Sequence, residues 1–453
     1  MRNTTLTRSH LRALVALPLA AAAVTTGVLS AAPAQAVGGI DGGNISTSGD
    51  VLTSVDVAAF GAGDALAAWT KPVVGGTKVY AAIATDGVWG APKAVTAAPV
   101  TNAHDVQALA NDAGQLAVVW NQTHAGEEKV RAARLLGNGN WDGSALLSPA
   151  VDIEKVISMD ADMDGAGRVH VAYEAQNNGV NRVETTMWTP GANPQFTPFP
   201  DHTFEPSLDA NPAGDVVMSY YASGNGGEIR VTRRNASVGW LGPKALPWTD
   251  DVLDDNVAVV ADNGAGAVMM GGLEDGEVRA VVTKVGADGS TGFPQAVSAA
   301  GVPTSYRDLA MSPNGTLQAS WSAFENDTTY VVRAAVAKPG QDFSTPSMVE
   351  SSTITTQANV GLISDRGAQV VVHNDDDELT FRHRTNPILI FGGYDAGATN
   401  GAFAADMDRD GNAVAVGIVE NGFSSYVEGD FLDVAGPQAA MTAPGAVVAA
   451  PTF

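Results

Sequence analysis

Two short segments have the residue types and spacing of a calcium-binding loop. Each reads Asp-x-Asp-x-Asp-Gly, with carboxylates at Asp160, Asp162 and Asp164 in the first copy and at Asp406, Asp408 and Asp410 in the second. Oxygen atoms on alternate residues of a tight loop can surround a hard cation, and glycine permits the sharp turn that brings them together. Both copies lack the bidentate glutamate of such loops, so turn formation without metal is the competing interpretation. We retain calcium as the candidate cofactor.

Other familiar catalytic centres are missing from the sequence. The chain has no cysteine, no HExxH metal motif, no Gly-x-Ser-x-Gly elbow and no phosphate-binding loop. The lack of cysteine excludes thiolate nucleophiles, cysteine metal sites and disulfides together, so the fold must depend on its apolar core. His104, next to Asp105, is the histidine best placed to take part in a site.

A pattern of about fifty residues repeats along the chain. Each copy has a short apolar strand, a turn that closes on glycine, a strand that is apolar on both faces and a second hairpin. The turns close at Gly63, Gly114, Gly167, Gly214, Gly266, Gly315, Gly367 and Gly411. Most open with Asn, Asp or Ser, whose side chain can accept a hydrogen bond from the backbone two residues on, and the closing glycine supplies a positive φ. These turns therefore fix the strand register.

The strands after the turns indicate sheets stacked face to face. Runs such as 116–120 and 169–173 are apolar or small at consecutive positions, whereas a strand with one wet face would alternate. Four strands in each repeat of this length are typical of β-propellers. We predict an all-β fold, a β-propeller of eight four-stranded blades that fills residues 37–453 as one domain. The alternative is seven blades with an irregular closing segment, in which a tail strand around Val447 and Val448 completes the ring.

The residue six positions after each repeat glycine is mostly aromatic. We predict that this column packs between blades and does not form stacking platforms for sugars. Its members are Trp69, Trp120, Tyr173, Tyr220, Gly272, Trp321, His373 and Gly417.

Short polar residues also recur near the start of the first strand of each repeat. The set consists of Asp56, Asp105, Ser207, Asn256, Asp308 and Asn359. If the first strands are innermost, these residues form a ring at the mouth of the central channel, where they could bind a cation or a basic group. The alternative is that they are Asx turns that join loops to strands.

The second hairpins resemble those of a known family. Segments 85–89 (TDGVW) and 138–141 (NGNW) are similar to the Asp-box turn, Ser-x-Asp-x-Gly-x-Thr-Trp, that joins the third and fourth strands of sialidase-like propeller blades. The similarity of architecture covers most of the chain, although no repeat has the full box. The resemblance implies an enzyme with an arginine cluster, a tyrosine with a nearby glutamate and an acid–base aspartate. Tyr306, Arg307 and Asp308 are the catalytic candidates that this set suggests.

The first 36 residues have the features of a signal peptide. Three arginines precede an apolar run over 14–29, and the small-residue pattern at 34–36 predicts cleavage after Ala36 and secretion. The formal net charge of −24 disfavours nucleic acid and anionic lipid as partners. No further segment is long and apolar enough for membrane insertion. We expect a secreted monomer whose partner is an extracellular glycan or protein.

Three functions fit these observations. The first is a non-catalytic binding module that displays a recognition surface on its loops, because no complete catalytic set is present. The second is a sialidase-like or other carbohydrate-active enzyme, which would need two suitably spaced carboxylates that the sequence cannot select. The third is a calcium-stabilised scaffold of the cell envelope.

Overall fold

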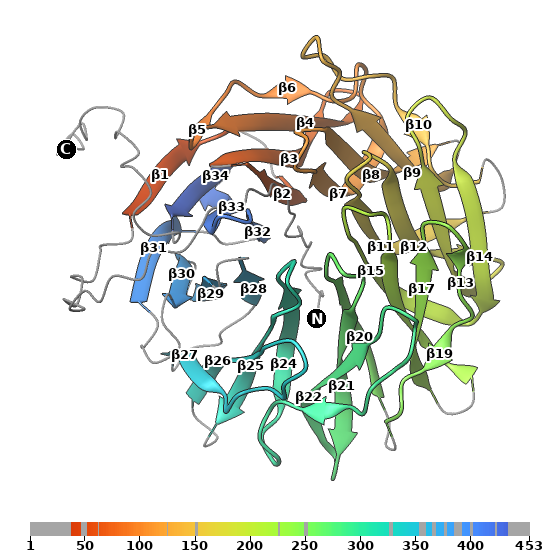
Figure 1. The fold of residues 1–453 in the computed structure, drawn as a ribbon. Coiled ribbons are helices and arrows are strands. Elements are labelled where there is room, and N and C mark those ends of the chain that lie inside the picture. Colours follow the sequence, from red (N-terminus) through yellow and green to blue (C-terminus); the bar gives the residue numbers. More distant parts are fainter. Residues whose placement is uncertain are drawn as a thin grey trace, which may run out of the picture.

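The structure, a computed structural model, describes most of the chain between residues 38 and 433 (Figure 1). The described ranges are 38–46, 52–61, 63–124, 126–149, 153–224, 227–248, 252–325, 329–352, 359–364, 368–375, 378–384, 392–398, 402–421 and 424–433. All elements in these ranges are strands or turns apart from one residue of 3-10 geometry, and no helix in them could cross a membrane.

The first four blades follow one another around the ring. Blade 1 holds β2 (Val55–Phe60), β3 (Asp64–Val73), β4 (Gly76–Thr85), β5 (Val88–Trp89) and β6 (Lys93–Ala94). Blade 2 holds β7 (Thr101–Ala110), β8 (Leu116–His124), β9 (Glu127–Arg134) and β10 (Ala145–Leu146). Blade 3 holds β11 (Lys155–Met163), β12 (Val169–Asn177), β13 (Val180–Trp188) and β14 (Gln195–Asp201). Blade 4 holds β15 (Thr203–Ala210), β16 (Val216–Ala222), β17 (Glu228–Asn235), β18 (Gly239–Trp240) and β19 (Lys244–Ala245).

The other four blades complete an antiparallel eight-bladed propeller. Blade 5 holds β20 (Val252–Val260), β21 (Gly266–Glu274), β22 (Glu277–Val285) and β23 (Gln295–Ala296). Blade 6 holds β24 (Thr304–Met311), β25 (Leu317–Glu325), β26 (Thr329–Ala337) and β27 (Ser347–Ser352). Blade 7 holds β28 (Asn359–Ile363), β29 (Gln369–Asp375), β30 (Glu378–Arg384) and β31 (Gly392–Ala398). Blade 8 holds β32 (Phe403–Met407), β33 (Asn412–Asn421), β34 (Ser424–Asp433) and β1 (Gly38–Asn44).

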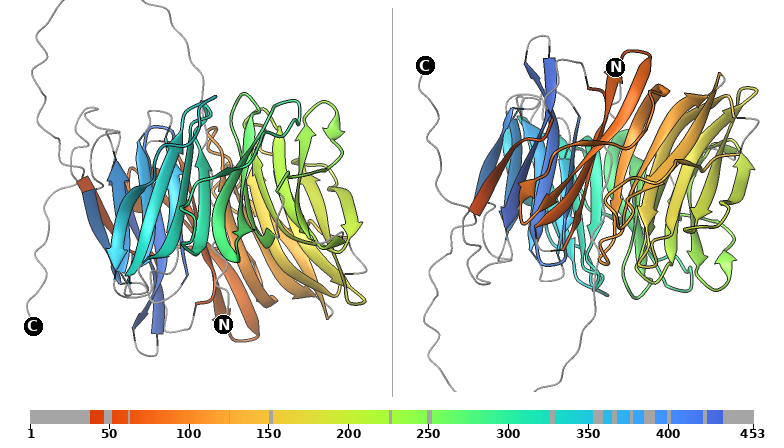
Figure 2. Two further views of the ribbon diagram at one scale, coloured as in Figure 1. Left: turned by 90° about the horizontal axis from the view of Figure 1, so that it is seen from below. Right: turned by 90° about the horizontal axis from the view of Figure 1, so that it is seen from above.

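The ring is closed by β1, the first strand in the described part of the chain. β1 pairs antiparallel with β34, from Gly38 opposite Asp433 to Asn44 opposite Glu428, and so becomes the outer strand of blade 8. Eight blades are therefore confirmed, and the seven-blade alternative is wrong, because the supposed irregular segment is a regular sheet completed by β1. Val447 and Val448 lie outside the described residues. Figure 2 shows the blades side by side in a flat disc.

The predicted turn chemistry is present. In blade 2 the amide of Gly114 donates to the carbonyl of Asn111 (2.8 Å), Asn111 Oδ1 accepts from the amides of Ala113 (3.2 Å) and Gln115 (3.0 Å), and Gly114 has a φ of 71°. Blade 5 departs from the prediction, because Gly264, with a φ of 77°, closes the turn, and Gly266 already belongs to β21. Gly367 lies outside the described residues.

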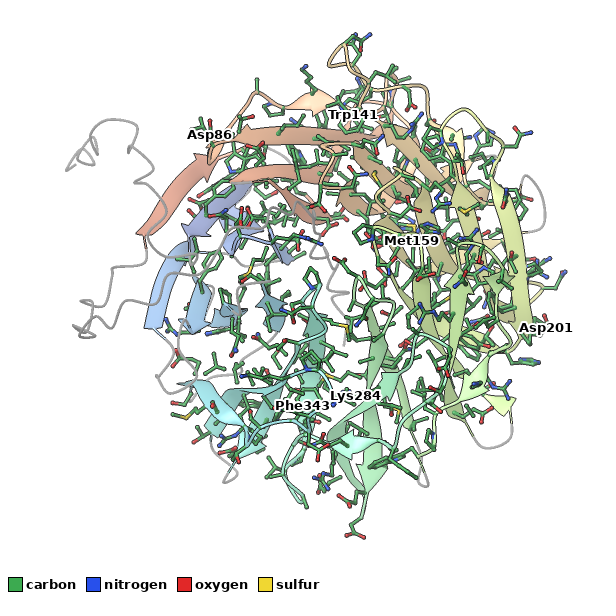
Figure 3. All side chains as sticks on the ribbon, in the orientation of Figure 1. Asp86, Trp141, Met159, Asp201, Lys284 and Phe343 are labelled. Carbon is green, nitrogen blue, oxygen red and sulfur yellow. The ribbon has the colours of Figure 1, made fainter. Side chains whose placement is uncertain are left out.

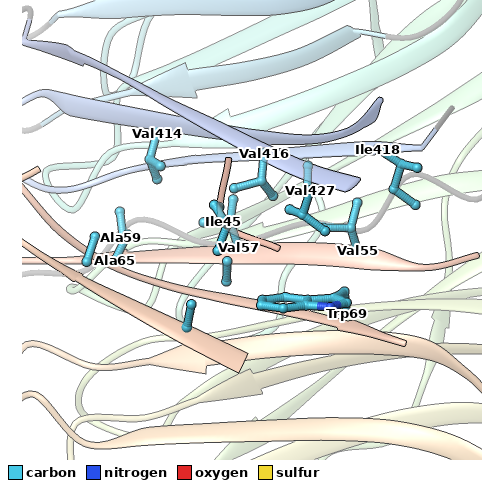
Figure 4. Close-up of a cluster of buried hydrophobic side chains, with 14 of the residues drawn as sticks. Ile45, Val55, Val57, Ala59, Ala65, Trp69, Val414, Val416, Ile418 and Val427 are labelled. Carbon is cyan, nitrogen blue, oxygen red and sulfur yellow. The ribbon is translucent and has the colours of Figure 1, made fainter. Parts of the chain in front are cut away.

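The aromatic column packs between blades as predicted. Trp69, Trp120 and Trp321 are at most 1% exposed, and Tyr173 and Tyr220 are fully buried. The corrected turn in blade 5 places buried Met270 in the column instead of Gly272. At the junction of the last and first blades, Val414, Val416 and Ile418 of β33 pack with Val55, Val57 and Trp69 of blade 1 (Figure 4). Burial of apolar side chains between neighbouring sheets therefore holds the ring together.

Candidate functional site

The alternating carboxylates of the inner strands bind the backbone of the next blade. Each innermost strand has one edge without a strand partner, which leaves amide groups exposed to the channel side. Asp160 Oδ2 accepts from the amide of Leu208 (2.6 Å), and Asp162 Oδ2 accepts from the amide of Ala210 (2.8 Å). Asp406 Oδ2 accepts from Ala59 (2.8 Å) across the junction of blades 8 and 1. These carboxylates therefore join consecutive blades.

This arrangement corrects the calcium-loop hypothesis. Asp160 and Asp162 lie in strand β11, and Asp406 lies in β32, so these carboxylates are not parts of a loop. Asp164 and Asp408 each open a turn and accept amide hydrogen bonds within it. Among the described residues, no group of three or more acidic or histidine side chains is arranged to hold a metal ion. The physical reason is that strand geometry points alternate side chains at the neighbouring blade and not at a common centre.

The two turn aspartates have opposite electrostatic environments. Burial raises the pKa of Asp408 to about 6. Burial also acts on Asp164, but hydrogen bonds from His170 (2.9 Å) and Arg168 (2.6 Å) outweigh it and lower the pKa of that carboxyl. Ionisation of the aspartate at this turn position is therefore unfavourable in blade 8, at Asp408, and favourable in blade 3, at Asp164.

We expect Asp408→Asn to stabilise the protein at pH 8. Because the folded pKa of about 6 lies above the ordinary 3.8, the stabilising protonated form is complete below pH 3.8 and is lost as the pH rises through 6. The amide cannot ionise and can still accept the turn amides, as Asn111 does, so the unfolding free energy should rise by about 1–2 kcal/mol. Urea unfolding at pH 4.5, 6 and 8 measures the difference from wild type.

Asp164→Asn is the matched control. It removes the charged acceptor of Arg168 and His170, so the unfolding free energy at pH 7 should fall by about 1–3 kcal/mol. A loss of stability in both variants at pH 8 would contradict the assignment for Asp408.

Only some members of the predicted channel-mouth ring occupy equivalent positions in their blades. Asp56, Ser207 and Asp308 occupy equivalent places and accept amide hydrogen bonds from the next inner strand, at Ala108 (2.8 Å), Ala258 (3.0 Å) and Gly361 (2.7 Å). Asn256 instead turns back to blade 4, where its Nδ2 donates to the carbonyl of Glu205 (2.8 Å). A shift of one residue moves a strand side chain to the opposite face, so the six residues do not form one ring. The side chain of Asn359 lies outside those that the structure describes.

Asp105, the remaining member of the set, belongs to a charged cluster in blade 2. His104 Nδ1 lies 2.7 Å from Asp105 Oδ2, and His104 Nε2 lies 3.6 Å from Glu128 Oε1. Burial opposes protonation of His104, but the two carboxylates outweigh it and raise the pKa of the imidazole to about 9. The histidine is therefore cationic at neutral pH and cannot act there as a general base.

Only one of the three catalytic candidates faces solvent. Tyr306 is 45% exposed. The Arg307 guanidinium bonds to Asp255 and donates to the carbonyl of Thr304 (2.7 Å), and its side chain is 5% exposed. Asp308 is buried against Gly361. The structure thus places the arginine and the aspartate in blade contacts, and the three side chains do not present one surface.

A cavity of about 440 Å³ lies where blades 3 and 4 meet, near the start of β15. We call it the blade 3–4 pocket. Its lining comes from the end of β14 and from the adjoining ends of β15, β16 and β17, namely Pro200, Asp201, His202, Thr203, Tyr220, Ala222, Ser223, Gly224, Glu228 and Arg230. Figure 3 places Asp201 at the outer edge of the disc, away from the channel. The pocket is therefore an off-axis site.

The segment that carries His202 is fixed at both ends of the pocket. The amide of His202 donates to the carbonyl of Asn181 (2.7 Å) in blade 3, and its carbonyl accepts from the amide of Ser223 (3.1 Å) in blade 4. His202 has a φ of 62°, a backbone conformation that side chains other than glycine adopt only where the surroundings hold them. The wall is therefore formed before any ligand arrives.

Tyr220 belongs to the wall of this pocket. Its side chain is fully buried, and Arg230 is the arginine that acts on its hydroxyl. Across the strand pair stands Arg230, whose Nε and Nη2 bind Glu228 Oε1 at 2.6 and 2.5 Å. Phe199 packs on the tyrosine ring with centroids 5.5 Å apart. Burial raises the pKa of Tyr220 to about 12, against the nearby Arg230, so the hydroxyl keeps its proton.

The equivalent tyrosine of blade 3, Tyr173, has a hydroxyl that is hydrogen-bonded to a glutamate. Tyr173 Oη donates to Glu184 Oε2 (2.7 Å), and Arg182 Nε donates to Glu184 Oε1 (2.7 Å). This is the type of tyrosine–glutamate pair that the enzymatic alternative requires. Both side chains are buried, and burial raises the pKa of Tyr173 well above its ordinary value. A nucleophile must reach its substrate and lose its proton readily, so this pair is suited to a structural role.

Sequence reasoning missed the blade 3–4 pocket. The sequence pattern places Tyr220 in the packing column, and nothing in the sequence joins 200–203 to 220–230. The available signal was a tyrosine in the column opposite an arginine.

Several solved structures resemble parts of this chain at low sequence identity. No family model and no curated protein matches the chain. A protein of unknown function from Dyadobacter fermentans is 10% identical, with 61% of this chain and 94% of the other covered and a TM-score of 0.42. A Hadza microbial sialidase is 12% identical (66% and 68% covered, TM-score 0.39), and an ulvan lyase of a polysaccharide lyase family is 11% identical (70% and 90% covered, TM-score 0.46). The strand topology places the chain in the class of eight-bladed β-propellers.

Proposed function

We propose that this chain is a non-catalytic extracellular β-propeller that binds a glycan in the blade 3–4 pocket. The observation that carries the proposal is the preformed cavity of about 440 Å³ at the meeting of blades 3 and 4, whose lining includes the Arg230–Glu228 pair.

The size and chemistry of the pocket suit a sugar. A volume of about 440 Å³ lies in the range of small-molecule sites. Sugar hydroxyls both donate and accept hydrogen bonds, which matches a lining that mixes a guanidinium and carboxylates.

Extracellular location rests on the predicted signal peptide. Cleavage after Ala36 would leave β1, which begins at Gly38, available to complete blade 8. We expect the mature protein to act as a monomer.

Absence of catalysis is the second half of the proposal. Glycoside hydrolysis needs one carboxyl group to give a proton and another to attack or activate water. In the pocket, Glu228 Oε1 is already bound twice by Arg230. Asp201 and Glu228 nevertheless line one cavity, which keeps a carbohydrate-active enzyme as the second candidate.

A glycan array combined with chromogenic glycosides tests both halves. Arg230→Ala should weaken glycan binding at least 10-fold, because it removes the donor that faces Tyr220. The matched control is Arg333→Ala: Arg333 stands opposite Trp321 in blade 6 and pairs with Glu325 at 2.6 and 2.9 Å, but it does not line the pocket. Equal binding by both variants would refute the site, and glycoside turnover abolished by Arg230→Ala would replace the binding module with an enzyme.

A further inference from the structure

The pocket contains more carboxylates than guanidinium groups. Its lining holds two carboxylates, Asp201 and Glu228, one arginine, Arg230, which is paired with Glu228, and one histidine, His202. The whole chain has a formal net charge of −24, which adds a repulsive background for anions.

Arg230 is already paired with Glu228, and this pairing limits how the pocket can bind an anion. Carboxylates are recognised best by two parallel hydrogen bonds from one edge of a guanidinium group. The Nε–Nη2 edge of Arg230 already binds Glu228 Oε1, at 2.6 and 2.5 Å. A ligand carboxylate would therefore have to displace Glu228 or meet a guanidinium whose charge is already balanced.

A neutral hydroxyl meets no such obstacle. It can donate to the carboxylates of Asp201 and Glu228 without bringing a charge into the pocket. Resting on the proposed glycan-binding function, we infer that the blade 3–4 pocket selects uncharged saccharides over saccharides that carry a carboxylate.

The test compares sugars that differ only at one carbon. Methyl glycosides of glucose, galactose and mannose and the three corresponding uronates are titrated calorimetrically at pH 8. In the pair that binds best, the neutral sugar should bind at least 10-fold more tightly in 50 mM salt. The ratio should shrink in 500 mM salt, because salt screens the repulsion.

Glu228→Gln provides the direct probe. It removes one negative charge and keeps nearly the same side-chain shape. The ratio of affinities for the neutral sugar and its uronate should therefore fall at least threefold. Glu325→Gln, in the corresponding pair of blade 6, should leave the preference unchanged.

A uronate that binds as tightly as its neutral partner, or more tightly, overturns the selectivity while the glycan-binding proposal stands. Failure of the wild-type protein to bind any glycan on the array or any of the six sugars overturns the proposed function and the selectivity with it.

Discussion

Replacing Asp406 by alanine should lower the free energy of unfolding by about 3 kcal/mol and loosen the ring at one place. Asp406 is 1% exposed, and its Oδ2 accepts from the amide of Ala59 at 2.8 Å, between residues separated by 347 positions in the chain. The substitution removes a charged acceptor and leaves a buried amide unsatisfied, which costs several times a surface contact. Urea unfolding gives the total loss, and hydrogen exchange locates it.

The location follows from the closure of the ring. β1 is attached to blade 8 through its pairing with β34, so the junction of blades 8 and 1 is where the disc can open. Asp209→Ala is the matched control, because Asp209 Oδ2 makes the same bond to the amide of Val260 (2.6 Å) between blades 4 and 5. Both variants should lose similar stability, but only Asp406→Ala should speed exchange in β1 and β34. Unchanged exchange in these strands would contradict this view of closure.

Replacing Glu184 by alanine should also cost about 3 kcal/mol. Glu184 is 3% exposed and accepts from both Tyr173 and Arg182, so its removal leaves a buried hydroxyl unpaired and takes the counter-charge from the arginine. Breaking a buried network by removing one partner is among the most damaging single changes. Chemical unfolding measures the loss, and a double-mutant cycle with Tyr173→Phe should show coupling of at least 1 kcal/mol.

Glu228→Ala is the control for that experiment. Glu228 pairs with Arg230 as Glu184 does with Arg182, but their side chains are 27% and 32% exposed. Partly exposed pairs contribute little, so the expected loss is below about 1 kcal/mol. Equal losses of unfolding free energy in Glu184→Ala and Glu228→Ala would show that burial does not make the first pair more stabilising than the second.

The local rules of the fold were readable in the sequence because they act over a few residues. Asn111 and Gly114 form the predicted hairpin turn, and their spacing fixes which side chains face the next blade. The misplaced turn glycine of blade 5 had little effect on that prediction: a shift from Gly264 to Gly266 is two residues, which leaves every strand side chain on its own face.

The same local rules gave wrong predictions where a shift of one residue changes the face on which a side chain lies, or where a neighbouring blade supplies its partner. Asn256 was aligned with Asp56 although it faces the other way, because bulges near the start of several inner strands change the register there. The Asp-x-Asp spacing fits both a metal-binding loop and a pair of hydrogen bonds between blades. The two interpretations are distinguished only by the amides of Leu208 and Ala210, which donate to Asp160 and Asp162.

By itself the sequence determined the repeat, the turns and the buried strands, because each depends on hydrogen bonds and side-chain pattern within one segment. Only the tertiary structure decided that β1 closes an eight-bladed ring, that the carboxylates cap the edges of neighbouring strands, and that Arg230 and Glu228 line a cavity whereas Arg182 and Glu184 bind the buried Tyr173. These outcomes depend on which groups of different blades come within bonding distance, and the free energy of such contacts exists only after the blades have packed.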